Sequence, residues 1–169
     1  MTKDALMGEF FFEAENTRRL LNAIPETALD YRAQPQLWSI AELAAHIAEV
    51  YNWFKPTFTR DVMDMGAYQY DKGDISTTAS IVAKLEENLN EAKHVLENAD
   101  ESSFNNTWHM QMDGNDILPP MPRHQVIRTF LLNHLYHHRG ELVAYLRASG
   151  NRVPGLYGPT YEESQAMAV

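Results

Sequence analysis

The chain of 169 residues is long enough to bury a hydrophobic core of its own, and we expect residues 1–169 to form one domain. Lys and Arg number 14 against 23 Asp and Glu, and the resulting formal net charge of -9 repels phosphate backbones and anionic lipid. Nucleic acid is therefore not an expected partner. The absence of cysteine excludes disulfides, protein thiolates and cysteine-rich zinc sites, so any metal must be held by His, Asp, Glu or water.

The N-terminal stretch MTKDALMGEFFFEAEN is interrupted by charged residues every few positions. It lacks the apolar run of a signal peptide and the ~20 apolar residues of a membrane span. The sequence therefore predicts a cytoplasmic protein that does not associate with a membrane.

Apolar residues recur at helical spacing in four stretches, which predicts helices over roughly 3–23, 39–64, 76–98 and 122–149. Ser39 and Glu42 have the spacing of a capping box at the start of the second helix, and Gly150 closes the fourth. Strand-like alternation is scarce outside these stretches, so the predicted fold class is all-α. The connection over 99–121 is long for a loop between helices, and loops of this kind often border a site.

The stretch LYHHRGEL, residues 135–142, follows directly on another histidine, His134. Each helical residue advances by about 100°, so His134 and His138 lie about 40° apart on one face, whereas His137 lies at the edge of that face. Such a pair is more often hydrogen-bonded or solvated than bound to metal, and a third ligand would favour the metal.

His46 stands within AELAAHIAEVYNWF, at a spacing that places it on the apolar stripe of the second helix. It can be buried as a neutral, hydrogen-bonded imidazole, or it can converge with His134 and His138 in the core, where facing helices build metal sites. Three imidazoles would leave open coordination positions for water or substrate, and zinc, nickel and iron all fit such a donor set. The histidines without a partner at ligand spacing are predicted surface residues: His94, His109 and His124.

Two carboxylates accompany these histidines at helical spacing. Glu49 follows His46 by three residues, and Glu141 follows His138 by three residues. Each can orient an imidazole or activate a water molecule, or can simply be solvated. Glu141 lies about 20° from His134 on a helical wheel, and we take it as the candidate catalytic residue.

Other residues near the histidines receive different interpretations. Arg139 faces away from them and is expected to form an ion pair or to cover an interface. The aromatic residues are expected to fill the core, and Tyr31, Trp38 and Trp108 are candidates for the mouth of the site.

Two segments, LDYRAQPQLWSIAELAAHIAEV and FLLNHLYHHRGELVAYLRASGNRVPGLYG, resemble the two characteristic regions of the DinB/YfiT-like metalloenzymes. The resemblance implies a four-helix bundle of up-down-down-up order, a homodimer, and a divalent metal held by His46, His134 and His138. Where relatives often read HHRGQL this chain reads HHRGEL, so Glu141 places a carboxylate where a glutamine is usual.

Characterised relatives include transferases and an isomerase that use low-molecular-weight thiols, although substrate does not follow from fold alone. The leading hypothesis is a metal-dependent enzyme for a small molecule, such as a thiol S-transferase. A metal-dependent hydrolase and a non-catalytic module that binds a metal or a ligand are the alternatives.

Overall fold

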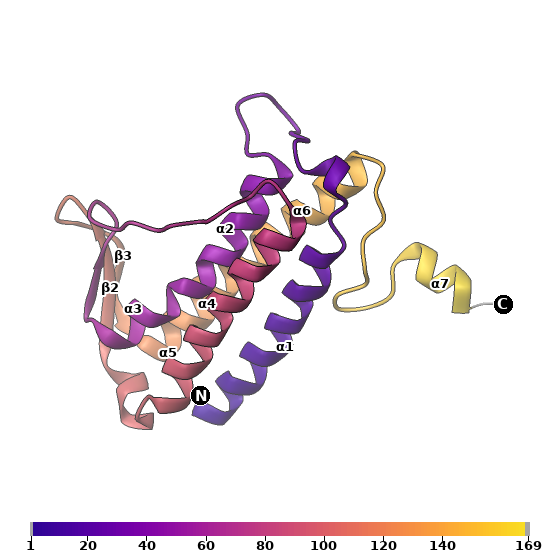
Figure 1. Ribbon diagram of the computed structural model, residues 1–169. Helices are drawn as coiled ribbons and strands as arrows, with labels where there is room; N and C mark the ends of the chain where they lie inside the picture. The colour runs from indigo at the N-terminus through magenta and orange to yellow at the C-terminus, as the bar shows by residue number, and fades with distance from the viewer. Residues whose placement is uncertain (1, 168–169) are drawn as a thin grey trace.

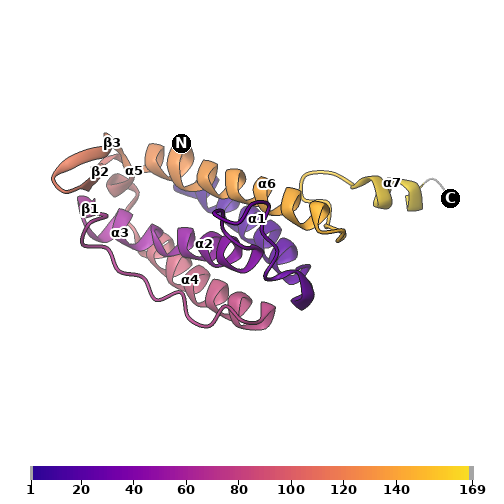
Figure 2. The ribbon, with the colours of Figure 1, turned by 90° about the horizontal axis from the view of Figure 1, so that it is seen from above.

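The computed structural model describes residues 2–167, and four long helices form its main body (Figure 1). They are α1 (Lys3–Asn22), α2 (Ile40–Asn52), α4 (Thr78–Asn98) and α6 (Asn133–Ala148). The helices lie side by side, as Figure 2 shows, and their apolar faces share one hydrophobic core. Helix α2 contacts both α4 and α6, which explains why most of its residues are buried.

The helix boundaries near the histidines follow from local hydrogen bonds that the sequence predicts. The Ser39 hydroxyl accepts a hydrogen bond from the Glu42 backbone N–H at 3.2 Å, and the Glu42 carboxylate accepts one from the Ser39 N–H at 2.8 Å. Gly150 adopts a φ of 82° and donates its N–H to the Arg147 carbonyl at 3.0 Å. The predicted capping box and glycine stop are both confirmed, and they fix the start of α2 and the end of α6.

The second predicted helix is too long, and the all-α prediction is wrong in one respect. Helix α2 is followed by α3 (Phe54–Thr59) and then by strand β1 (Val62–Asp64). β1 pairs in parallel with β2 (Thr107–Met112), and β2 pairs antiparallel with β3 (Asn115–Pro122). The chain therefore adds a three-stranded sheet, in the order β1-β2-β3, to its helices.

The hairpin replaces most of the loop predicted over 99–121, and local chemistry explains it. Trp108 and Met110 are buried, whereas Thr107 is exposed and His109 and Gln111 are partly exposed, which is the alternation of a strand with one covered face. Asp113 and Gly114 have φ values of 52° and 78°, as a two-residue turn of type I′ requires. The Asp-Gly pair is the signal that indicates this hairpin in the sequence.

The fourth predicted helix is confirmed in extent but is not uniform. It begins with α5 (Arg123–Val126), continues as a π-helical segment over Ile127–Leu132, and becomes α6 at Asn133. π-Helical turns inside helices are frequent at functional sites. Here the π-helical segment ends two residues before His134.

The remaining segments connect or extend the helices. Short 3₁₀ turns occupy Glu26–Ala28 and Glu101–Asn105. Residues 65–77 have no regular structure and run back along the helices from the sheet to the start of α4 (Figure 1). Helix α7 (Tyr161–Met167) projects beyond the ends of the other helices and buries none of its residues (Figures 1 and 2).

Arg139 is almost fully buried and joins α6 to α1. Its guanidinium forms an ion pair with the Glu13 carboxylate and donates a hydrogen bond to the Glu13 carbonyl at 2.9 Å. The Tyr157 hydroxyl donates to the same carboxylate at 2.6 Å. The expectation that Arg139 forms an ion pair is confirmed.

Within residues 2–167, none of the helices combines the length and the apolar character needed to cross a membrane.

Candidate metal centre

Three histidines from two helices converge between α2 and α6. The Nε2 atom of His46 lies 3.1 Å from Nε2 of His134, and Nε2 of His138 lies 2.9 Å from the same His134 nitrogen. The ligand atoms of the three residues all lie within 4.8 Å of one another. His138 is buried and the other two are partly buried. The structure therefore brings together the three residues that the sequence singled out, at a separation that suits one shared ion.

The outer nitrogen of two of these imidazoles is fixed by a carboxylate. Nδ1–H of His46 donates to Glu49 Oε2 at 3.0 Å, and Nδ1–H of His138 donates to Glu141 Oε2 at 3.0 Å. Glu49 thus orients His46, one of the two roles expected for it. Glu141 contacts His138 rather than His134, whose direction it shares on the helical wheel.

These hydrogen bonds determine the chemistry of the three inward nitrogens. With Nδ1 protonated, Nε2 of His46 and of His138 carry lone pairs, and both point at Nε2 of His134. The His134 nitrogen can donate a hydrogen bond to only one of them. A cation between the three nitrogens satisfies every lone pair at once, so the residues present fit a divalent metal ion.

The local environment keeps the imidazoles neutral. Burial, together with repulsion from His138 and His46, lowers the pKa of His134 to about 4. Burial also lowers the pKa of His138, although the hydrogen bond to Glu141 opposes part of this effect. Both side chains are therefore neutral near pH 7, which is the state that binds a metal.

Aromatic rings enclose the histidine cluster. The Trp38 ring lies 4.8 Å from the His46 ring and 5.8 Å from the His138 ring, measured between centroids. The stacked rings of Trp53 and Phe130 lie 5.3 Å and 5.6 Å from the His134 ring. Trp38 was expected at the mouth, and Trp53 follows His46 on the apolar stripe of the second predicted helix, whereas Phe130 was not expected beside a ligand.

The other two residues expected at the mouth lie elsewhere. Trp108 belongs to β2, and its fully buried side chain donates its indole N–H to the Pro56 carbonyl at 3.2 Å. Tyr31 packs edge to face against Tyr145 at 6.1 Å between ring centroids. Both rings serve the core, which is the commoner use of an aromatic side chain.

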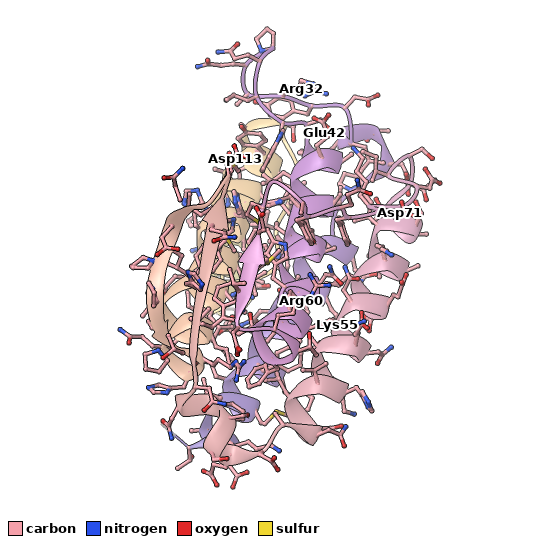
Figure 3. The ribbon with its side chains drawn as sticks, turned by 90° about the vertical axis from the view of Figure 1, so that its left-hand side faces the viewer. Arg32, Glu42, Lys55, Arg60, Asp71 and Asp113 are labelled. Carbon is pink, nitrogen blue, oxygen red and sulfur yellow. The ribbon has the colours of Figure 1, made fainter. Side chains whose placement is uncertain are left out.

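A cavity of about 320 Å³ opens beside the cluster. Its lining comes from the loop before α2, from α2 itself and from the connection that carries Tyr68, Tyr70 and Lys72. Arg32 and Glu42 lie together at one end of this side of the molecule (Figure 3), where they form an ion pair at 2.7 Å. The segment that borders the site is thus 65–77, and not 99–121 as the loop length suggested.

The remaining histidines lie outside the cluster. His137, predicted at the edge of the histidine face, is exposed, and with His138 and Glu141 it forms a second group whose ligand atoms lie within 4.8 Å of one another. His94 is also exposed. His109 and His124 are partly buried rather than fully on the surface, since His109 bonds Asp116 at 2.6 Å and His124 bonds a backbone carbonyl.

Known proteins resemble this chain over nearly its whole length. A model of the DinB family matches residues 1–168. YrdA, an uncharacterized protein of Bacillus subtilis, is 28% identical over 165 residues, covering 96% of this chain and 92% of YrdA. A DinB-like protein from Bacillus cereus has a similar structure, with a TM-score of 0.70, 21% identity, and coverage of 92% of this chain and 98% of its own.

A second structural relative is YfiT from Bacillus subtilis, which is described as a probable metal-dependent hydrolase with an unusual four-helix bundle topology. Its TM-score is 0.64 at 15% identity, and the match covers 89% of each chain. At these identities the two structures support the fold of this chain and leave its reaction open.

Proposed function

Because this chain belongs to the DinB family, we propose that it is a metal-dependent enzyme in which His46, His134 and His138 hold one divalent ion. The observation that carries the proposal is the convergence of three Nε2 atoms, two of them fixed as lone-pair donors by Glu49 and Glu141. Three imidazoles suit zinc, nickel or iron. Elemental analysis of protein purified without added metal identifies the ion.

The ion, when bound, supplies a Lewis acid that lowers the pKa of water or of a thiol at its open positions. The protein contributes the remaining steps. Trp38, Trp53 and Phe130 exclude bulk water from the faces of the imidazoles. Glu141 is the proposed catalytic carboxylate, because its side chain is about one-third exposed and can pass a proton from the reacting group to solvent.

We propose transfer of a low-molecular-weight thiol as the reaction. The chain has no cysteine, so a sulfur nucleophile has to come from a small molecule. The thiol sulfur forms a bond to an electrophilic carbon of the second substrate, the leaving group departs with its electron pair, and the thiol proton passes to Glu141. The cavity of about 320 Å³ beside the histidines is the proposed binding place for these small molecules.

Hydrolysis is the second candidate, and the similarity to YfiT favours it. Metal-loaded protein should be assayed with an electrophilic substrate, with and without an added thiol. Release of the leaving group only when thiol is present supports the transferase. Release without thiol supports the hydrolase, and turnover in neither assay supports a non-catalytic binding module.

The ligand assignment is tested by substituting each histidine singly with alanine. His46→Ala, His134→Ala and His138→Ala should each lose stoichiometric metal, and His137→Ala is the matched control that should retain it. Metal retained in all three ligand variants would refute the site. Equal loss in His137→Ala would move the assignment to the second group, which contains His137 and Glu141.

Two further proposals concern architecture. The up-down-down-up order of the helices is supported by the connection 65–77, which returns along the helices so that α4 can begin near the start of α2 (Figure 1).

A homodimer is supported by large exposed apolar side chains on α1 and the C-terminal segment, among them Phe12, Tyr157 and Tyr161. Sedimentation that gives a monomer at micromolar concentration would refute the dimer.

A further inference from the structure

An ion pair ties down the loop that leads into α2. Residues 32–38 of this loop are exposed and belong to no helix or strand. Arg32 Nη1 donates to Glu42 Oε2 at 2.7 Å and also to the Leu37 carbonyl at 2.7 Å. Arg32 and Glu42 lie together where the loop meets α2 (Figure 3), so one guanidinium joins both ends of the loop to the helix.

Both peptide groups that flank Trp38 are bound by this ion pair. The carbonyl before Trp38 is that of Leu37, which accepts from Arg32. The N–H after Trp38 is that of Ser39, which donates to Glu42 Oε2 at 2.8 Å, the same oxygen that accepts from Arg32. Because peptide groups are planar, the two soft dihedral angles of Trp38 are those that relate these two groups. The ion pair therefore fixes the backbone conformation of Trp38.

This backbone conformation directs the Trp38 ring at the metal centre. The ring lies 4.8 Å from that of His46 and 5.8 Å from that of His138, measured between centroids, and it lines the cavity of about 320 Å³. Its side chain is nevertheless 45% exposed. Burial alone holds such a ring weakly, so its position depends on the backbone that carries it.

We propose that Arg32 is a positioning residue of the metal centre: by binding Leu37 and Glu42, it keeps the Trp38 ring over His46 and His138. This inference rests on the proposed metal-binding function. A ring that is held in place shields the imidazoles from water and small molecules, whereas a ring that swings with its loop admits them. Arg32 therefore controls access to the ion without contacting the ion or a ligand.

The position of Trp38 can be measured by ¹⁹F NMR of metal-free protein in which the three tryptophans are replaced by 5-fluorotryptophan. Trp38→Phe assigns the Trp38 signal. Arg32→Met removes the guanidinium and should move this signal towards that of solvent-exposed fluorotryptophan, while the signals of the buried Trp53 and Trp108 stay unchanged. Lys55→Met is the matched control, since it breaks another exposed ion pair on the same side of the molecule (Figure 3) and should leave all three signals in place.

The consequence for the site can be measured as the rate at which a chelator removes zinc. Loss of an exposed ion pair raises the population of the open loop by about fivefold, so zinc should leave Arg32→Met about fivefold faster than the parent. Its equilibrium affinity for zinc should stay within about twofold of the parent, because gating changes entry and exit alike and the three histidines are untouched. Lys55→Met should match the parent in both rate and affinity.

An unmoved Trp38 signal in Arg32→Met would overturn the positioning role. A moved signal with a zinc release rate equal to that of the parent would overturn the control of access. A parent protein that binds no divalent metal would refute the proposed function instead, whereas the NMR measurement needs no metal and still decides whether Arg32 positions Trp38.

Discussion

Lowering the pH from 7.5 to 5.5 should weaken metal binding less than three ordinary histidine ligands would. A histidine with a pKa of about 6.5 is about nine-tenths protonated at pH 5.5, so it weakens affinity about 10-fold, and three such ligands weaken it about 1000-fold. Burial and neighbouring imidazoles lower the pKa of His134 to about 4, so this ligand is still neutral at pH 5.5. The pKa of His138 is lowered as well. We therefore expect a loss on the order of 100-fold or less.

Protons compete with the metal ion for the imidazole nitrogens, so the pKa of each ligand decides the pH at which metal affinity is lost. A lowered pKa means that the folded site takes up protons only at lower pH, so affinity is retained further into acid and is lost as the pH falls towards about 4. Competition against a chelator of known pH dependence, at constant ionic strength, measures the affinity at each pH. A loss of the full 1000-fold by pH 5.5 would refute the lowered pKa of His134. Affinity retained below about pH 4 would refute imidazole ligands altogether.

Two other substitutions test the surroundings of the site. Glu141→Gln should preserve the fold and weaken metal affinity by about 10-fold or change the pH profile of activity, because the amide carries no charge and cannot accept a proton. An affinity and a pH profile equal to those of the parent would show that the charge of Glu141 has no role at the site. Arg139→Met should lower the free energy of unfolding by about 3–5 kcal/mol, because it leaves the Glu13 carboxylate buried without its cation. Denaturant unfolding measures this change, and a loss below about 1 kcal/mol would contradict the role of the ion pair.

The sequence predicts the helices and the histidine cluster because both depend on a local period. A rotation of about 100° per residue places His134 above His138 and points His46 inward, whatever the rest of the chain does. The capping box at Ser39 and the glycine at 150 are equally local, since each uses backbone groups within a few residues. These features could therefore be predicted without knowledge of the tertiary structure.

The sheet and the rim of the site depend on contacts between distant segments. β1 pairs with β2 across more than 40 residues, for example Met63 with Met110, and its short apolar run is not distinguishable from the end of a helix. Tyr68 lies in a stretch without periodicity, so its place on the cavity that Glu49 also lines follows only from the path of the connection 65–77. The Asp113-Gly114 turn was a local signal, and the hairpin could have been predicted from it.

The carboxylate at 141 changes the electrostatics of the centre in a definite direction. Glu49 and Glu141 each accept an Nδ1–H, so a divalent ion held by the three histidines would have its two positive charges balanced by two nearby carboxylates. A glutamine at 141 would leave one positive charge uncompensated. In a partly buried site of low effective dielectric, that difference strengthens the hold on the cation and weakens the attraction for an anionic substrate. The histidine cluster of this chain should therefore retain its ion more firmly than a glutamine-bearing relative, and should prefer substrates that arrive neutral and give up a proton at the site.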